Sequence, residues 1–450
     1  MDIIYHKIKE NYGYAKPYKE SLHTHTHSLS LSRRNFCLFK GLKANPNRKS
    51  QRGGIMPRII LAMFTFILCL SWAEVKVEKV LETTSIKEYN QWVKKNKAKY
   101  PGLNFIYVNA ELEEKTKEGR RYKIHYYDEN GNKKHTEEVK GNIDVIVSPY
   151  MDAVGIYTCA PYRPADAVIK NEKGETILIT HGFLAFVSPY LYLTIPEDGE
   201  CSPPNPTVKV FHAKQRQWTD TLEDCWLLNG RDVAHSYNFK FSIVSICKNT
   251  NCDSLQLILL DSTGREKWRK PYFRILGQVG GGLTVAIAPD ASYIVARKGD
   301  KVDVYDFNGV LQKEYPLPSP PPAQCGISEK GKYLVVVTRN TITKYDNETQ
   351  REIWHKEIME GAPKRVVLSK NGDYALIQFH PNIIYLLDKN GDILKQCSLE
   401  TEIHHPTAPG GKEITVIHPV EARLEFHDDI VVIFYEIEGK IYAKIWRIKE

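Results

Sequence analysis

The clearest pattern in the chain is an alternation of apolar and polar residues that recurs about every forty residues in its second half. Three stretches match one another in order and residue type: IAPDASYIVA (287–296), ISEKGKYLVV (327–336) and LSKNGDYALI (368–377). An apolar run that alternates with a period of two predicts a β-strand. A unit of this length with four short strands is typical of one blade of a β-propeller.

A second landmark follows each stretch, where an apolar run ends at an aspartate and a short polar turn begins. Asp, Asn and Gly tolerate the backbone conformations of tight turns, so the pattern predicts a hairpin at each of these places. We therefore assign these residues a structural role in turns and no catalytic role. The turn residues assigned in this way are Asp128, Asp261, Asp306, Asp346, Asp388, Gly264, Gly309 and Gly391.

The units can be counted from about residue 142 to the end of the chain. The predicted blades span 142–182, 183–222, 223–275, 280–320, 322–362, 363–405 and 412–450. The sequence therefore predicts an all-β fold, a β-propeller of seven four-stranded blades within residues 121–450, with six or eight blades as the alternatives. The last unit stops before an outermost strand, and an open sheet edge exposes unpaired backbone groups. We expect the strand at Tyr122–Val139 to complete that sheet and so join the two ends of the ring.

The stretch MPRIILAMFTFILCLSWAE (56–74) has the pattern of a secretory signal peptide. Arg58 gives a positive charge, an apolar run follows, and Ser71 and Ala73 are the small residues of a cleavage site. We expect cleavage between Ala73 and Glu74, hence export to the periplasm or the outside of the cell, with no membrane segment left in the mature chain. Residues 1–55 are then a disordered leader that precedes the true start at Met56.

Residues 74–120 differ from the repeats and are expected to form a small α/β appendage. Ser85 and Glu88 are spaced as a capping box, and apolar residues follow at helical spacing until Pro101. A strand is expected next, at Leu103–Val108.

The charge distribution argues against a nucleic-acid partner. The chain has 62 Lys and Arg and 54 Asp and Glu, a formal net charge of +8. Of these, 12 basic and 3 acidic residues lie in residues 1–73, which leaves 50 against 51 in the rest of the chain. The expected mature protein is nearly neutral, so it lacks the basic surplus of a nucleic-acid binder.

We expect the mature protein to be a monomer.

Seven cysteines follow the predicted cleavage site, and export would permit disulfides. Cys247 and Cys252 are close enough in sequence to close a small loop, so we assign them a possible disulfide. A metal site is the competing interpretation, but the spacing is not that of paired CxxC motifs.

The turn followed by a tryptophan, as in LLDSTGREKW (259–268) and KYDNETQREIW (344–354), resembles the repeats of quinoprotein-like propellers. The SxxGxY turns resemble equally those of WD40-like and YVTN-type bacterial propellers. The likeness covers residues 240–400 best. Lys313 and Lys395 stand where the resemblance implies tryptophan, and no adjacent cysteine pair of the quinone-binding kind is present. We therefore predict no cofactor.

No motif points to a particular reaction. The chain has no GxSxG turn, and LGQVGGGL (276–283) lacks the ending of a phosphate-binding loop. His404 and His405 lie in an expected loop, and we assign no catalytic or metal-binding residue. The sequence favours an exported, non-enzymatic propeller that acts as a rigid binding platform for an envelope protein, a peptide or a glycan. The alternative is a propeller enzyme, such as a lactonase, a lyase or a quinoprotein-like oxidoreductase, with its site in the central channel.

Overall fold

The chain divides into two compact units, Met1–Trp72 and Ala73–Glu450, and every described residue belongs to the second unit. In the computed structural model, the described residues are 75–116, 119–158, 166–181, 184–194, 207–223, 233–247, 254–273, 285–298, 300–317, 323–358, 361–400, 402–404, 416–418, 420, 422–437 and 439–449. The predicted leader, signal peptide and cleavage site at Ala73 and Glu74 lie outside them.

The second unit is built almost entirely from small antiparallel sheets. Five of them each have four strands that follow one another in sequence. The first two in chain order are formed by β5 (Ile143–Val147), β6 (Ala153–Thr158), β7 (Asp166–Asn171) and β8 (Thr176–His181), and by β13 (Val233–His235), β14 (Phe241–Cys247), β15 (Ser254–Asp261) and β16 (Glu266–Phe273). The other three are formed by β17 (Val285–Ile287), β18 (Tyr293–Lys298), β19 (Lys301–Asp306) and β20 (Leu311–Pro316); by β21 (Ala323–Ile327), β22 (Tyr333–Thr338), β23 (Thr341–Asp346) and β24 (Arg351–Glu357); and by β25 (Pro363–Leu368), β26 (Ala375–Phe379), β27 (Ile383–Leu387) and β28 (Ile393–Ser398). A sixth has the same form, with β9 (Leu184–Phe186), β10 (Leu191–Thr194), β11 (Thr207–His212) and β12 (Gln217–Glu223). A two-stranded ladder pairs β29 (Glu402–His404) with β30 (Val416–His418).

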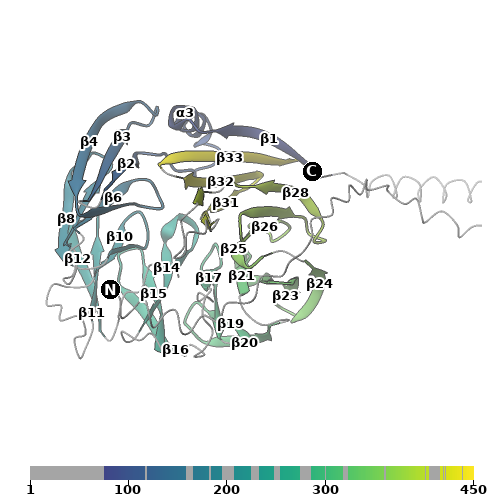
Figure 1. The fold of residues 1–450 in the computed structure, drawn as a ribbon. Coiled ribbons are helices and arrows are strands. Elements are labelled where there is room, and N and C mark those ends of the chain that lie inside the picture. The colour runs from purple at the N-terminus through teal and green to yellow at the C-terminus, as the bar shows by residue number, and fades with distance from the viewer. Residues whose placement is uncertain are drawn as a thin grey trace, which may run out of the picture. The chain divides into compact units, whose positions relative to one another are not determined.

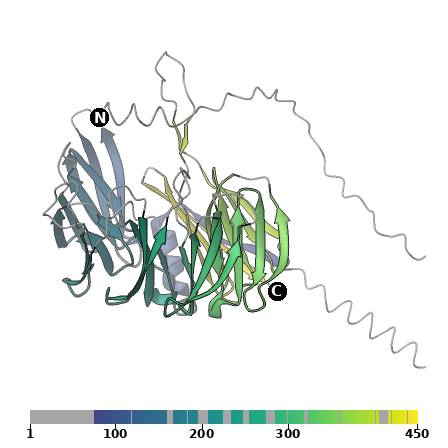
Figure 2. The ribbon, with the colours of Figure 1, turned by 90° about the horizontal axis from the view of Figure 1, so that it is seen from below.

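The sheets lie around a common centre, as Figure 1 shows for this unit. The first strand of each sheet, such as β17, β21 and β25, lies nearest the centre, and the last strand, such as β20 or β24, lies at the rim. Figure 2 shows the same unit turned by 90°, with the strands running between the two ends of the ring. This arrangement is that of a β-propeller, so the predicted fold class is confirmed.

The seventh four-stranded sheet contains both ends of the unit. It is formed by β31 (Arg423–His427), β32 (Ile430–Ile437) and β33 (Lys440–Lys449), and its outermost strand is β1 (Lys76–Thr83). β1 pairs antiparallel to β33, with Val77 opposite Ile448. The sequence correctly indicated that this sheet needs an outer strand from the other end of the chain. The expected donor at Tyr122–Val139 is wrong, because β1 already occupies that edge.

The segment assigned to that role instead forms an eighth sheet. β2 (Val108–Lys115), β3 (Arg120–Tyr127) and β4 (Lys133–Gly141) make three antiparallel strands next to β5. The main count of seven blades is therefore wrong by one, and the alternative of eight is correct. All seven counted segments hold a sheet, but the count began after residue 142 and missed this one. Within the expected appendage, residues 74–120, β1 and β2 are therefore strands of the ring, and the helix between them lies outside its sheets.

Only one α-helix lies in the described part of the chain, α3 (Ile86–Asn96), between β1 and β2. Ser85 caps it, accepting the Glu88 N–H at 3.3 Å as its spacing predicts. The Glu88 carboxylate accepts a bond from the Thr83 hydroxyl. Val93 packs against β32 and β33. The strand expected at Leu103–Val108 is absent, because these residues cross from the helix to the start of β2, which begins only at Val108.

The apolar run LQLILL in β15 shows how each sheet is buried on both faces. Leu257 and Leu259 pack against the following sheet, whereas Ile258 and Leu260 pack against the preceding one. All four side chains are at most 1% exposed. Burial of such a side chain contributes about 2 kcal/mol. A strand between two neighbours therefore needs a continuous apolar run in place of alternation.

The predicted turns hold neighbouring sheets together at the rim. Trp268 Nε1 donates to Phe307 O, and Trp354 Nε1 donates to Lys389 O, both at 2.8 Å. Gly309 packs against the Trp268 indole, and a Cβ atom on this glycine would be 2.9 Å from Trp268 Cδ2. Lys313 stands at the tryptophan position in the sheet between them, and its Nζ donates to Glu348 O at 2.9 Å. The resemblance implied a tryptophan at this position. The contact with the next turn is made here by the Lys313 amine.

Candidate functional site

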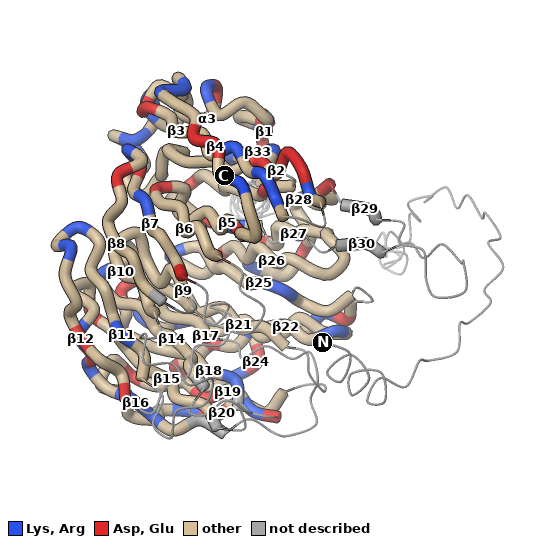
Figure 3. Tube along the Cα trace, turned by 60° about the vertical axis from the view of Figure 1, so that its left-hand side comes forward, with Lys and Arg blue, Asp and Glu red and all other residues tan. Residues whose placement is uncertain are grey.

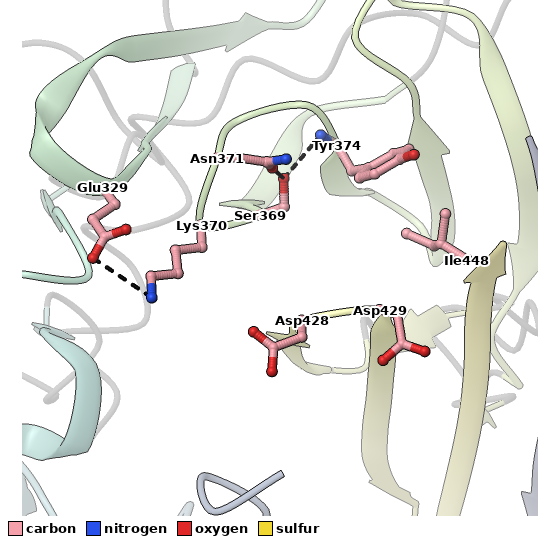
Figure 4. A pocket seen from close by; sticks show the side chains of 8 residues that line it. All are labelled: Glu329, Ser369, Lys370, Asn371, Tyr374, Asp428, Asp429 and Ile448. Atoms are coloured by element: carbon pink, nitrogen blue, oxygen red, sulfur yellow. Dashed lines mark hydrogen bonds and ion pairs between the residues drawn. The ribbon is translucent and has the colours of Figure 1, made fainter. Parts of the chain in front are cut away.

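A pocket of about 530 Å³ opens among the turns that join the first and second strands of three consecutive sheets. We call it the end pocket. The turns are those between β21 and β22, β25 and β26, and β31 and β32, and Figure 4 shows their side chains around the opening. The lining residues are Glu329, Ser369, Lys370, Asn371, Tyr374, Asp428, Asp429 and Ile448.

Two of these turns follow directly from the SxxGxY repeat. The hydroxyls of Ser328 and Ser369 each accept a backbone N–H five residues later, at 2.9 Å. Gly372 has φ of 75°, which glycine adopts without strain. A bond from Glu329 N–H to Lys370 O, 3.0 Å long, joins the two turns. The pocket wall on this side is therefore set by backbone and capping bonds.

The opposite wall carries two adjacent aspartates with different surroundings. Asp429 accepts a bond from the Tyr100 hydroxyl at 2.7 Å and lies 3.5 Å from Lys99 Nζ and from Arg447 Nε. Burial alone would raise the pKa of Asp429, but Tyr100 and Lys99 outweigh it and lower the pKa. Asp428 is exposed and makes no side-chain bond with the described part of the chain. Asp429 thus has a structural role, and Asp428 is open to a ligand.

The pocket offers one carboxylate, Asp428, that no described cation offsets, beside an apolar wall, because Lys99 and Arg447 lie beside Asp429. Lys370 Nζ lies 3.8 Å from Glu329 Oε1, so its charge is partly offset within the pocket. Asp428 and Asp429 remain on the other side, and the Tyr374 ring and the Ile448 side chain lie between the two walls (Figure 4). Such a lining suits a cation on an aliphatic stem, because carboxylates attract the charge and the apolar wall covers the stem.

Near the axis, a second polar group lies on β31. Glu425 accepts bonds from Arg423 and from His427 Nε2, the latter at 2.8 Å. Burial alone would raise the pKa of Glu425, but Arg423 and His427 hold it well below its usual range. Arg423 also donates to Pro149 O at 3.1 Å, in the turn between β5 and β6. A Cβ atom on Gly102 would lie 2.8 Å from His427 Cε1, so the chain after α3 closes on this group.

A buried tyrosine and histidine continue this central packing. The Tyr150 hydroxyl donates to Val187 O at 3.0 Å and contacts His235 Nε2. Burial, with the charges of Arg365 and Arg423, lowers the pKa of His235 to about 3. This imidazole is therefore neutral at pH 7. The axial residues bond to one another and to backbone groups, which favours a packing role for them.

The sequence-assigned turn residues lie at the rim, away from the end pocket. The carboxylates of Asp128, Asp261, Asp306, Asp346 and Asp388 each accept one or two backbone N–H groups of their own turns. Gly264, Gly309 and Gly391 have φ values of 82°, 76° and 81°. Cys247 ends β14, but Cys252 lies outside the described residues, and so does any bond between them. The side chains of His404 and His405 also lie outside them.

Sequence reasoning missed the residues that line the end pocket. The SEKG and SKNG turns were recognised as structural, but nothing in them indicated that Glu329 and Lys370 meet. Asp428 and Asp429 belong to the last unit, which aligns poorly with the repeat. A paired DD at the turn position of that unit was the only signal available.

The described part of the chain contains no cluster of three or more His, Cys, Asp or Glu residues that could hold a metal ion. Among the same residues, no helix has both the length and the apolar character needed to cross a membrane. Figure 3 shows basic and acidic residues interspersed along the strands.

The fold defines the chain as a β-propeller of eight sheets. No protein-family model matches its sequence, and no curated protein matches it. Among solved structures, the chain is similar to the crystal structure of BamB from Moraxella catarrhalis, with 11% sequence identity and a TM-score of 0.44. The match covers 76% of this chain and 99% of that one. The assignment to the propeller class rests on the sheets themselves, and this likeness carries no argument for function.

Proposed function

We propose that the protein is an exported, non-enzymatic binding platform, and that the end pocket binds a side chain of a partner protein of the cell envelope or the extracellular space. The observation that carries this proposal is the pocket itself, which brings turns of three separate sheets together around one opening. Turns fixed on packed sheets form a pre-ordered surface, and recognition by such loops on a rigid scaffold is common.

The charge of the pocket selects the ligand. Lys370 is paired with Glu329, and Asp429 with Lys99 and Arg447, which leaves the exposed Asp428 to meet a lysine or arginine that a partner inserts. Tyr374 and Ile448 supply the apolar contact for its stem. A lysine or arginine of the partner would thus contact Asp428 through its charge and the apolar residues through its stem.

A photocrosslinking amino acid at Asn371 tests the proposal in the cell that makes the protein. We expect it to crosslink one exported protein through a segment that contains Lys or Arg. Asp428→Lys should lower that yield about tenfold or more, because repulsion then replaces attraction. Yield is measured by mass spectrometry of the crosslinked peptides.

Glu348→Lys is the matched control, because Glu348 is exposed on the turn between β23 and β24 and lies outside the pocket. It carries the same change of charge and should leave the yield unchanged. Equal losses with both variants, or the same products from a crosslinker placed at Glu348, would contradict a specific role for the end pocket.

A further inference from the structure

One sheet of the ring has one strand fewer than the others among the described residues. Seven sheets have four strands, whereas β2, β3 and β4 form a sheet of three. The turn from Asp128 to Gly131 joins β3 to β4, and its counterpart from Asp306 to Gly309 joins the third strand, β19, to the fourth, β20. β2, β3 and β4 therefore correspond to the second, third and fourth strands, and the innermost strand is the missing one.

The packing between sheets supports this assignment. His135 stands four residues after Gly131, as Trp268 stands four residues after Gly264. A Cβ atom on Gly174, in the next sheet, would lie 2.9 Å from His135 Nε2, just as one on Gly309 would lie 2.9 Å from Trp268. His135 thus has the place of a residue on a fourth strand, which makes β4 the fourth strand.

Among the described residues, other segments cover only the first half of the edge that this leaves on β2, from Val108 to Glu111. The N–H groups of Tyr107 and Val108 donate to Met151 O at 2.9 and 3.0 Å. The Asn109 side chain donates to Gly439 O at 2.7 Å, so the turn between β32 and β33 contacts β2 there. From Glu111 to Lys115 every residue of β2 is exposed. A Cβ atom on Gly439 would lie 2.8 Å from Glu111 Cα and 3.0 Å from Ala110 O, so this turn also covers the edge at Ala110. We call the side of β2 opposite β3, from Leu112 to Lys115, the open edge.

The direction of the backbone groups follows from one hydrogen bond. Tyr127 N–H donates to Tyr107 O, so Asn109 and Glu111 also bond to β3 in the antiparallel ladder. The N–H and C=O groups of Ala110 and Leu112 then point to the other side. Among the described strands, none pairs with β2 on that side. An unpaired strand edge is a template for another strand.

The side chains beside the open edge define what a partner strand would carry. Ala110 packs towards the sheet of β5, and Leu112, two residues on, shares that face and is 41% exposed. Glu111 faces the other way, with its side chain 54% exposed and 3.5 Å from His125. Burial lowers the pKa of His125, so its ring is neutral at pH 7 and does not balance the Glu111 charge.

We propose that the open edge binds an extended segment of a partner protein as the missing first strand of this sheet, with an apolar side chain beside Leu112 and a Lys or Arg beside Glu111. Addition of a strand to an exposed edge draws affinity from main-chain bonds and specificity from alternate side chains. The first strands of the other seven sheets show the geometry that fits this place. The proposal does not depend on the end pocket, because the two surfaces share no residue.

A peptide of ten residues that alternates Val and Lys is the first probe, and binding to the full mature protein is measured by calorimetry. Two peptides of related composition are compared with it, a block peptide of five Lys and five Val, and the alternating peptide methylated at every backbone nitrogen. We expect the alternating peptide to bind at least tenfold more tightly than either, because both comparators keep the charge but lose the strand pattern or its N–H donors. Equal binding of all three would show attraction by charge alone and would overturn the proposal.

Protein variants place the peptide on β2. Leu112→Pro removes an N–H group from the open edge without removing a bond to β3, and it should abolish binding. Glu111→Lys should weaken binding about tenfold, and Glu348→Lys, on a remote turn, should not change it. If Leu112→Pro fails to fold, amide hydrogen exchange of the unaltered protein, measured with and without the peptide, locates the binding site instead. The peptide should slow exchange at Leu112, and protection confined to outer strands such as β4 or β8 would refute the open edge as the site.

Discussion

At the scale of single residues, bonds between side chains and neighbouring turns hold the rim of the ring together. Trp268, Lys313 and Trp354 each donate one hydrogen bond to a carbonyl of the next turn. The sequence identified the tryptophans but suggested that the link was lost at Lys313. It is not lost, because the long amine of Lys313 reaches a carbonyl of the next turn, Glu348 O, as the two indoles reach carbonyls of theirs.

Trp268→Phe should lower the free energy of unfolding by about 1 kcal/mol, because it removes the indole donor and leaves Phe307 O without that bond. Urea unfolding monitored by circular dichroism measures the change. Trp218→Phe is the control, since Trp218 is 45% exposed on the outer strand β12 and should cost less than about 0.5 kcal/mol. Equal losses for both variants would contradict the role of the rim bond.

Glu436, near the end of β32, gives a stability that depends on pH. Burial raises its pKa from 4.5 to about 7, and a backbone bond from Gly439 lowers it only in part. Because the folded protein binds this proton more tightly than the unfolded chain, stability should fall as pH rises from about 4.5 to 7. Glu436→Gln removes this titration. The variant should gain up to roughly 3 kcal/mol over the unaltered protein at pH 8, and almost none at pH 4.

The comparison requires unfolding curves of both proteins across the pH range. A constant difference between Glu436→Gln and the unaltered protein at every pH would show that the Glu436 pKa is not raised.

At the scale of elements, β1 is the strand whose position the local pattern did not reveal. Residues 76–83 contain the polar run KVEKVLET, which has little of the β-branched alternation seen in the repeats. One face nevertheless packs, because Val77 lies against the cluster of β32 and β33 side chains. An outer strand needs only one apolar face, so its sequence signal is weak.

Val77→Asp should destabilise the fold by about 2 kcal/mol or more, because it places a charge against this apolar cluster. Hydrogen exchange should then accelerate in β33, whose edge β1 covers. Glu78→Gln, on the exposed face of the same strand, removes only the surface ion pair with Lys449 and should leave the free energy of unfolding nearly unchanged. If Val77→Asp were as mild as Glu78→Gln, β1 would not be part of the folded sheet.

At the scale of the whole molecule, the compact unit that begins at Ala73 contains every described element. The predicted cleavage site lies at this boundary. β1 starts only at Lys76, so a chain cut after Ala73 would retain the strand that completes the last sheet.

Intact mass spectrometry of the protein from its native cells should therefore show a mature chain that starts at Glu74. The expected reason is the signal pattern of residues 56–73, with small residues at Ser71 and Ala73. Peptides from residues 1–50 would contradict the leader assignment, and a chain that retains residues 56–73 would contradict cleavage.

The sequence by itself determined the repeated unit, the turns at Asp306, Asp346 and Asp388, and the capped helix at Ser85. These are local properties, since they depend on residue types a few positions apart. Only the tertiary structure decided that the ring has eight sheets, that β1 pairs with β33, and that no described strand takes the innermost place beside β2. It also brought Glu329, Lys370 and Asp428 around one pocket. Such features depend on which distant segments meet when the ring closes, and no local pattern of side chains encodes that meeting.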